Sequence, residues 1–291
     1  MTHILTLVAD RRQTSLSDAQ IARIRDAIGG APPHILSPGE AADIPCKTAP
    51  LAALVAEAIG AAAIDAIATP VRNRRKGLLV ADMDSTIVTS ETLDELAAHA
   101  GLGERIAAIT RQSMNGEIDF ADALRQRVAM LRALPLAALE KTWETIELTD
   151  GAAELVATMR AHNATTALVS GGFTCFTSRL AAKLGFTHHR ANTLLDDGET
   201  LTGEVAEPIL DRDAKRTTLE ELAAARNLQL SATLAIGDGA NDLAMLRAAG
   251  LGIAFHAKPI VAAEARSQIR HGTLRAALFA QGYHFGQFVA A

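Results

Sequence analysis

The sequence predicts an α/β protein in which a small α+β domain precedes a larger domain built on a parallel sheet. Short, continuous apolar runs recur between helical stretches from residue 77 onward, a pattern typical of parallel strands buried on both faces. Residues at about 92–148 show a helical spacing of apolar side chains throughout. The chain of 291 residues is long enough for about two domains with substantial cores.

The N-terminal domain, residues 1–71, is predicted to be ferredoxin-like because its apolar pattern follows the order β-α-β-β-α-β. The corresponding segments are a strand at 4–9, a helix at about 16–28, extended chain at 33–44, a helix from 51 and a strand at 63–68. This order also resembles that of ACT-like regulatory domains that bind amino acids, a match carried by element order alone. A regulatory binding module is therefore the alternative to an enzyme.

A short basic stretch marks the boundary between the two predicted domains. We interpret it as a solvated linker rather than a docking patch for an anionic partner, because the run is brief. Its charges belong to Arg72, Arg74, Arg75 and Lys76.

The second domain, residues 77–291, is predicted to hold a Rossmann-like parallel sheet. The expected strands are the apolar runs at 78–81, 165–169, 234–236 and 251–255. The helical insertion at about 92–148 follows the first of these strands. We therefore expect it to form a cap over the edge of the sheet.

The composition argues against nucleic-acid binding, membrane insertion and export. The formal net charge is −5 and only ten residues are aromatic, whereas nucleic acids require clustered Lys and Arg and, for single strands, stacking rings. The best transmembrane candidate, residues 51–71, contains Glu57 and Asp65 and is rich in alanine. The N-terminus lacks the order of a signal peptide, and Cys46 and Cys175 have no zinc-ligand spacing, so we expect a cytoplasmic protein.

Polar residues follow the predicted parallel strands, where the active crevice of such a sheet lies. Asp82 and Asp84 follow the first strand, and two carboxylates one residue apart suit a divalent cation and acid–base chemistry. The segment Ser170-Gly171-Gly172 follows the second strand and offers a hydroxyl and close backbone N–H groups to an anion. Taken singly, each segment also fits an ordinary turn at the end of a strand.

An acidic, glycine-rich turn at Gly237–Asp242 follows the third strand and begins a helix. It can bring carboxylates to a metal ion and an amide to a ligand. Lys215 lies at a predicted helix start, where its charge opposes the helix dipole, so it is either an ordinary surface lysine or required by a site. All four segments are expected at one edge of the sheet. It is improbable that each has a purely structural role and that they meet there by chance.

This constellation resembles the haloacid dehalogenase-like phosphohydrolases over about residues 78–288. Within that superfamily, four segments are similar to those of the phosphoserine phosphatase family, namely DMDSTIVTSETLDELA, MNGEIDFADALRQRVAML, LVSGGF and AIGDGANDLAML. The resemblance implies Mg²⁺-dependent hydrolysis of O-phospho-L-serine, the last step of serine biosynthesis. The expected partner is this small molecule; the sequence leaves the oligomeric state open, with a homodimer as the candidate. The alternative is a phosphatase or phosphotransferase that acts on another small phosphomonoester.

The resemblance also implies roles for individual residues. Asp82 is the expected nucleophile and forms an aspartyl-phosphate, and Asp84 is the expected acid and then base. The expected Mg²⁺ ligands are Asp82, the backbone carbonyl of Asp84, and Asp238. The expected contacts of the phosphoryl group are Ser170, the Gly171 N–H, Lys215 and Asn241, with Asp242 orienting Lys215 or the metal shell.

Substrate choice is expected to depend on the cap. The resemblance implies that Glu91 holds the ammonium group of the substrate and Arg127 its carboxylate, and the charges agree with these roles. Arg125, Arg127 and Arg132 are clustered in the sequence, so each is also a candidate for a solvated helix residue. The candidates for an apolar wall that excludes water, or for cap core, are Met114 and Phe120.

Overall fold

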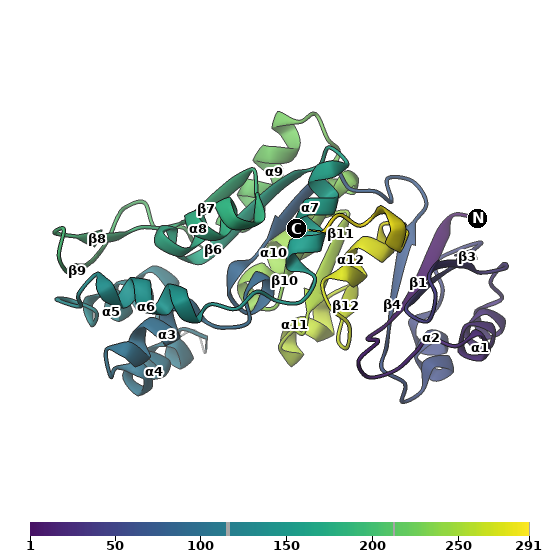
Figure 1. The fold of residues 1–291 in the computed structure, drawn as a ribbon, viewed down its shortest axis with the longest axis horizontal. Coiled ribbons are helices and arrows are strands. Elements are labelled where there is room, and N and C mark those ends of the chain that lie inside the picture. The colour runs from purple at the N-terminus through teal and green to yellow at the C-terminus, as the bar shows by residue number, and fades with distance from the viewer. Residues whose placement is uncertain (115–116, 212, 291) are drawn as a thin grey trace.

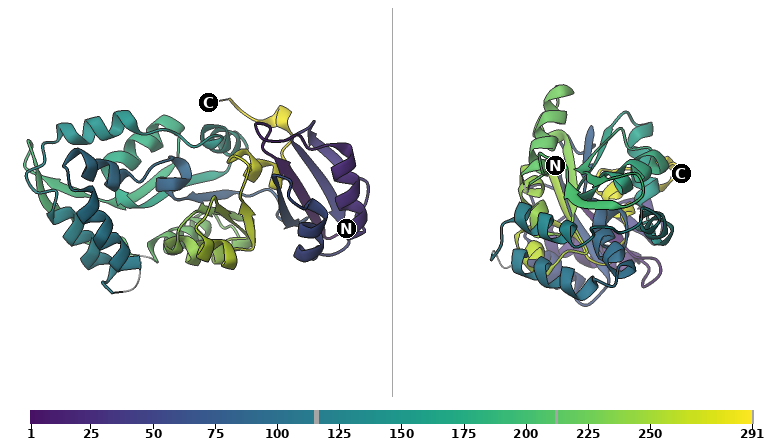
Figure 2. Two further views of the ribbon diagram at one scale, coloured as in Figure 1. Left: turned by 90° about the horizontal axis from the view of Figure 1, so that it is seen from below. Right: turned by 90° about the vertical axis from the view of Figure 1, so that its left-hand side faces the viewer.

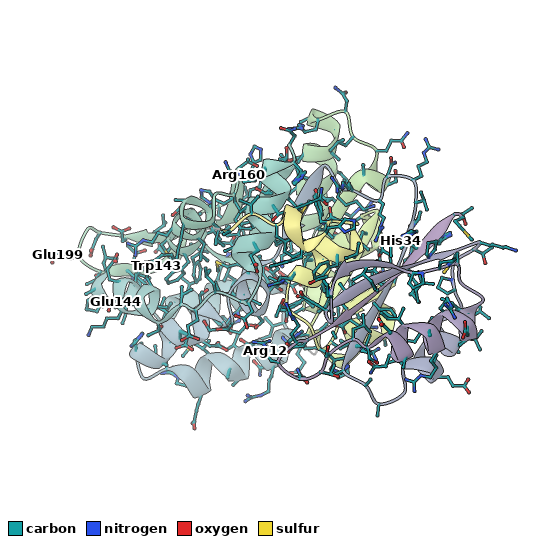
Figure 3. The ribbon with its side chains drawn as sticks, turned by 45° about the vertical axis from the view of Figure 1, so that its right-hand side comes forward. Arg12, His34, Trp143, Glu144, Arg160 and Glu199 are labelled. Carbon is teal, nitrogen blue, oxygen red and sulfur yellow. The ribbon has the colours of Figure 1, made fainter. Side chains whose placement is uncertain are left out.

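The computed structural model describes residues 1–114, 117–211 and 213–290. Within these residues the chain forms a four-stranded antiparallel sheet, a six-stranded parallel sheet and a two-stranded hairpin. The N-terminal sheet lies at one end of an elongated molecule, and helices α3 to α6 with the β8–β9 hairpin lie at the other (Figures 1 and 2). In Figure 3, Glu199 lies at the cap end, and His34 lies on the side of the N-terminal domain. No helix in the described ranges combines the length and the apolar character needed to cross a membrane.

The first 70 residues fold in the predicted order β-α-β-β-α-β. The elements are β1 His3–Ala9, α1 Asp18–Ile28, β2 His34–Ser37, β3 Ala41–Cys46, α2 Ala52–Ile59 and β4 Ile64–Pro70. The strands lie in the ferredoxin-like order β2-β3-β1-β4, and every neighbouring pair is antiparallel. Helix α1 begins at a capping box formed by Ser17 and Gln20 and ends at Gly29, which has a positive φ. The ACT-like interpretation stays a prediction.

The parallel sheet contains the four expected strands and two further ones at its edges. In spatial order the strands are β12 Ser267–Ile269, β11 Leu251–Phe255, β10 Thr233–Gly237, β5 Leu78–Ala81, β6 Thr165–Phe173 and β7 His188–Asn192. The sequence prediction missed β7 and β12, because β12 is short and three of the five residues of β7 are exposed. An edge strand of this kind has no continuous apolar run.

Helices cover both faces of the parallel sheet, as the alternation along β5 shows. Leu79 and Ala81 face a cluster that includes α7 Ala152–Ala161, α8 Thr174–Leu184 and α12 Arg275–Ala280. Leu78 and Val80 face a second cluster on the opposite side. The helices on that side are α9 Ala214–Ala225, α10 Leu243–Ala248 and α11 Pro259–Glu264. Burial of both faces explains the continuous apolar runs that identify these strands in the sequence.

The expected helical insertion follows β5. Its helices are α3 Thr92–His99, α4 Gly103–Met114, α5 Phe120–Ala129 and α6 Ala137–Thr145. The two chain segments that join it to the sheet lie side by side, because Val88 pairs with Leu148 in a β-bridge.

A hairpin that the sequence prediction missed extends the cap. Its strands are β8 Leu194–Asp196 and β9 Leu201–Val205, and β9 packs against α5. The turn contains Asp197 and Gly198, and Gly198 has a φ of 93°. An Asp-Gly pair between short apolar segments is the signal that indicates such a hairpin.

The prediction of a solvated linker is wrong for two of the four cations at 72–76, Arg74 and Lys76, whereas Arg72 and Arg75 are exposed. The Arg74 side chain is 15% exposed, and its guanidinium donates to both carboxylate oxygens of Asp43 at 2.7 Å. Lys76 is buried and donates to the carbonyl oxygen of Ser231 at 2.8 Å, and burial lowers the pKa of Lys76 to about 8. Arg74 thus binds the N-terminal sheet, and Lys76 binds the chain that leads into β10.

A buried carboxylate also joins the N-terminal sheet to the core. Asp65 on β4 is 3% exposed and accepts hydrogen bonds from the backbone N–H groups of Arg270 and Gly272, both at 2.7 Å, and of His271 at 3.3 Å. Figure 3 shows Arg12 at the same junction, where it pairs with Asp150 of the core. The apolar residues of the N-terminal sheet that join the core cluster are Val8, Leu36, Ala41 and Ile67.

Candidate active site

Neighbouring strands bring the predicted chemical groups together at the carboxyl edge of the parallel sheet. The strands β10, β5 and β6 are adjacent. Asp238 and Asp82 directly follow β10 and β5, and Ser170 lies near the end of β6. All three residues are at most 6% exposed. Side chains far apart in the sequence therefore meet in one buried crevice.

A buried lysine lies between two aspartates of this crevice. Lys215, in the first turn of α9, is 4% exposed, and its Nζ lies 2.6 Å from Oδ2 of Asp82 and 2.5 Å from Oδ1 of Asp242. Burial favours the neutral amine, but the two carboxylates outweigh burial and raise the pKa of Lys215 above its usual range. A permanently charged ammonium in this position stabilises negative charge beside Asp82.

The carboxylate of Asp82 is fixed on both of its oxygens. Oδ1 accepts the N–H of Met83 at 2.7 Å, and Oδ2 faces Lys215. Burial and the nearby charge of Asp242 raise the pKa of Asp82, whereas Lys215 lowers it. Asp82 is thus a buried, oriented carboxylate beside a cation, as nucleophilic attack on an anionic group requires.

Three carboxylates could hold a metal ion. Oxygens of Asp82, Asp238 and Asp242 lie within 4.8 Å of one another, and all three residues are buried. Burial, followed by the charges of Asp242 and Glu91, raises the pKa of Asp238 to about 6. Clustered, desolvated carboxylates of this kind fit a hard divalent cation, which relieves their repulsion. The side chain of Asp84 is not in this group, so a contribution from Asp84 has to come from its backbone carbonyl.

The carboxyl group of Asp84 instead contacts Thr92 and Ser170. Its Oδ1 accepts the N–H of Thr92 at 2.9 Å, and its Oδ2 accepts the hydroxyl of Ser170 at 3.4 Å. Burial, and next the charge of Glu91, raise the pKa of Asp84 to about 7. A carboxyl group with this pKa can both donate and accept a proton near neutral pH.

The Ser170-Gly171-Gly172 segment lies in close contact with Asp84 and with the cap. The N–H of Gly172 donates to Ser170 Oγ at 2.9 Å. A Cβ atom on Gly172 would lie 3.0 Å from Oδ2 of Asp84, and one on Gly171 would lie 3.3 Å from the ring of Phe120 in the cap. The glycines therefore let the backbone approach both the acidic group and the cap.

Sequence reasoning missed a residue that connects this segment to the chain leading into α9. Asn192, at the end of β7, is 2% exposed; its side-chain amide donates to the carbonyl of Gly171 at 2.9 Å and accepts the N–H of Leu210 at 2.8 Å. Asn192 thereby positions the segment that carries Ser170. The rule that polar residues follow parallel strands identifies Asn192 only once β7 is recognised.

The structure distinguishes Arg127 from the other two clustered arginines. Arg125 pairs with Asp122 and Glu207, and Arg132 approaches Glu204. Arg127, in contrast, has no carboxylate partner among the described residues. Its Nε donates to the carbonyl of Ala123 and its Nη1 lies 3.4 Å from Thr110 Oγ1, so the guanidinium is half-buried and free for an anionic ligand.

The remaining predicted residues surround the same crevice. Glu91 is exposed, and its Oε1 accepts the hydroxyl of Ser85 at 2.9 Å. The amide of Asn241 folds over Gly239, where a Cβ atom would lie 2.4 Å from Asn241 Oδ1. Phe120 lies over Gly171, and the side chain of Met114 falls outside the described residues.

Comparison with known proteins identifies the class to which this fold and crevice belong. The model of the haloacid dehalogenase-like hydrolase family matches residues 79–247, and the chain belongs to that family. The matched region begins at β5 and includes Asp82, Lys215 and Asp242.

Individual relatives are more specific. The chain is 46% identical to a phosphoserine phosphatase of Streptococcus thermophilus over 67% of this chain and 90% of the relative, and 43% identical to one of Archaeoglobus fulgidus over 65% and 55%. The chain thus spans about half the length of the Archaeoglobus relative. A probable phosphoserine phosphatase of Vibrio cholerae is similar over 98% of this chain and 88% of that chain, with 31% identity and a TM-score of 0.79. A phosphoserine phosphatase solved as a phospho-aspartyl intermediate analogue is similar over 70% and 98%, with 40% identity and a TM-score of 0.65.

Proposed function

We propose that this chain hydrolyses O-phospho-L-serine to L-serine and phosphate. The observation that carries the proposal is the buried contact between Lys215 and Asp82 at the edge where Asp238 and Ser170 converge. A carboxylate held beside a buried ammonium is arranged to attack a phosphoryl group that would otherwise repel it. The phosphoserine phosphatases reported above support the choice of substrate.

The reaction follows from the positions of the two aspartates. The Asp82 carboxylate attacks phosphorus and forms an aspartyl-phosphate, while the bond from phosphorus to the seryl oxygen breaks. Asp84 gives its proton to the departing alkoxide, which leaves as the hydroxyl of serine. Asp84 then takes a proton from water as that water attacks phosphorus, releasing phosphate and restoring Asp82.

Positive charge offsets the charge of the phosphoryl group during both steps. Lys215 supplies a fixed ammonium, and Asp242 holds it in place through the contact at 2.5 Å. The hydroxyl of Ser170 and the N–H of Gly171 supply neutral donors to phosphoryl oxygens, and the Asn241 amide borders the same turn. Mg²⁺, held by Asp82, Asp238 and the Asp84 carbonyl, supplies Lewis-acid stabilisation when bound.

The cap supplies the groups that recognise an amino acid. Glu91 carries a carboxylate for the substrate ammonium, and Arg127 carries a guanidinium with no carboxylate partner in the described chain. Phe120 covers the phosphate-binding segment and excludes water there. We further propose that the reaction completes serine synthesis in the cytoplasm, which agrees with two cysteines that are both free.

A phosphate-release assay tests the proposal. The panel contains O-phospho-L-serine, glycerol phosphate, a sugar phosphate and homoserine phosphate, each with Mg²⁺ and with EDTA. We expect a kcat/KM for phosphoserine at least about tenfold above the others and no turnover in EDTA. Comparable rates on glycerol phosphate and phosphoserine would contradict the amino-acid specificity.

A further inference from the structure

Glu91, the proposed ammonium-binding residue, is not held by the helix that it precedes. It occupies the position before α3, and its side chain makes no capping hydrogen bond there. A glutamate on an exposed loop has considerable rotamer freedom. Some other group must therefore fix its carboxylate if it is to meet a substrate in one geometry.

The hydroxyl of Ser85 lies where it can fix the Glu91 carboxylate. Ser85 Oγ donates to Glu91 Oε1 at 2.9 Å, and the Ser85 N–H donates to the carbonyl of Ser90 at 3.2 Å. These two bonds close the loop from Ser85 to Glu91 on itself. Ser85 directly follows Asp84, so the loop begins inside the reaction site.

The backbone of Ser85 has a conformation that favours glycine over serine. Its φ of 53° and ψ of 7° lie in the left-handed region, where glycine is free of steric cost and serine is not. Glycine would satisfy the turn and keep the N–H bond to Ser90. Among the described residues, the hydroxyl of Ser85 bonds only to Glu91, and this bond is what glycine would lose.

Two charged groups near Glu91 interact with its carboxylate. Burial lowers the pKa of Arg127, and the charges of Asp94 and then Glu91 oppose this shift. Glu91 also adds to the effect of burial in raising the pKa of Asp84, so its carboxylate lies within electrostatic range of both groups. Arg127 attracts Glu91, yet no ion pair joins them in the part of the chain that the structure describes. If they paired, the two groups proposed to bind the substrate would neutralise each other.

We propose that Ser85 is a specificity-determining positioning residue, whose hydroxyl holds the Glu91 carboxylate apart from Arg127 and aims it at the ammonium group of the substrate. This inference rests on the proposed function and adds a residue to it. Ser85 acts through Glu91 and touches no reacting atom. Its loss therefore affects substrates with an ammonium group and spares those without one.

The test compares Ser85→Gly and Ser85→Ala with the wild type on two substrates. O-phospho-L-serine carries an ammonium group where 3-phosphoglycerate carries a hydroxyl. We expect kcat/KM for phosphoserine to fall about tenfold in both variants, mainly through KM, and kcat/KM for 3-phosphoglycerate to change less than about twofold. Competitive inhibition by L-serine should weaken in parallel, and inhibition by glycerate should not.

Ser90→Ala is the matched control. Ser90 lies in the same loop, and its Oγ is buried with no hydrogen-bond partner in the described structure, so its removal should leave the ratio of the two substrates unchanged. Because Ser85→Gly also relieves the left-handed backbone, it keeps the test valid if Ser85→Ala folds poorly. An unchanged ratio in Ser85→Gly, or an equal change in Ser90→Ala, would overturn the inference. Absence of turnover of phosphoserine by the wild type would instead reject the proposed function.

Discussion

Lys215 Nζ lies 2.6 Å from Oδ2 of Asp82, and both side chains are at most 7% exposed. Neither group has bulk water to stabilise its charge, so each depends on the other. Asp242 contacts the same ammonium at 2.5 Å. The three residues form a buried charged unit in which the loss of one member leaves the others uncompensated.

Lys215→Met therefore changes both activity and stability. We expect kcat/KM for phosphoserine to fall by at least about 100-fold, because the phosphoryl charge loses a fixed cation. In EDTA we expect the free energy of unfolding to fall by about 3 kcal/mol, since two buried carboxylates face each other unpaired. Urea unfolding measures the second effect. Lys183→Met, at an exposed position of α8, is the control, and equal losses in both variants would contradict the account.

Arg127→Ala should impair substrates in proportion to their need for a carboxylate contact. We expect kcat/KM for phosphoserine to fall about 100-fold, while O-phosphoethanolamine, which has no carboxylate, changes less than about threefold. Arg127→Lys should restore only part of the loss because an ammonium lacks the two-pronged grip. The control is Arg125→Ala, whose guanidinium is already paired with Asp122 and Glu207. Uniform losses on both substrates would assign Arg127 to cap structure.

The stability of the metal-free protein should decline as the pH rises from about 4 to 7. The pKa of Asp84 is raised from 3.8 to about 7 and that of Asp238 from 3.8 to about 6, in both cases chiefly by burial. In this range the folded protein binds more protons than the unfolded chain, so deprotonation at higher pH favours unfolding. Urea unfolding in EDTA at pH 4.5, 6 and 7.5 measures the trend. Mg²⁺ should reduce the slope, and the same slope in Asp84→Asn would contradict the assignment to Asp84.

Asp65→Ala should destabilise the fold without touching the active site. The substitution leaves three backbone N–H groups in the contact between the two sheets without their acceptor. We expect the free energy of unfolding to fall by about 2–4 kcal/mol. Asp26→Ala, on the exposed side of α1, should change it by less than about 0.5 kcal/mol. If Asp65→Ala lowered the free energy of unfolding by less than about 0.5 kcal/mol, water would be able to replace the carboxylate as acceptor for these N–H groups, and the account would be contradicted.

The sequence predicts those strands whose burial on both faces produces a continuous apolar run. Strands β5, β6, β10 and β11 are buried on both faces, so their apolar runs are continuous. Strand β7 is an exposed edge strand, and its pattern resembles that of a loop. Asn192 was missed for the same reason, since its position becomes meaningful only at the end of a strand.

The roles of several residues depend on neighbours that are distant in the sequence, so the sequence pattern alone does not predict them. Arg74 lies in a basic run that predicts a solvated linker, but Asp43 lies next to it only after the two sheets pack together. The sequence offers three clustered arginines in the cap, and only the folded chain shows that Arg125 is already paired. Ser85 likewise becomes relevant only through its left-handed backbone and its bond to Glu91.

The most direct test of the account is phosphate release from O-phospho-L-serine by the wild type and by Asp82→Asn, both with Mg²⁺. Asparagine retains an acceptor for the Met83 N–H, so the fold should persist, which a thermal melt checks. We expect rapid release by the wild type and a rate below about one thousandth of it in Asp82→Asn, since no aspartyl-phosphate can form. Turnover by a folded Asp82→Asn protein within tenfold of the wild type would contradict the nucleophilic role of Asp82.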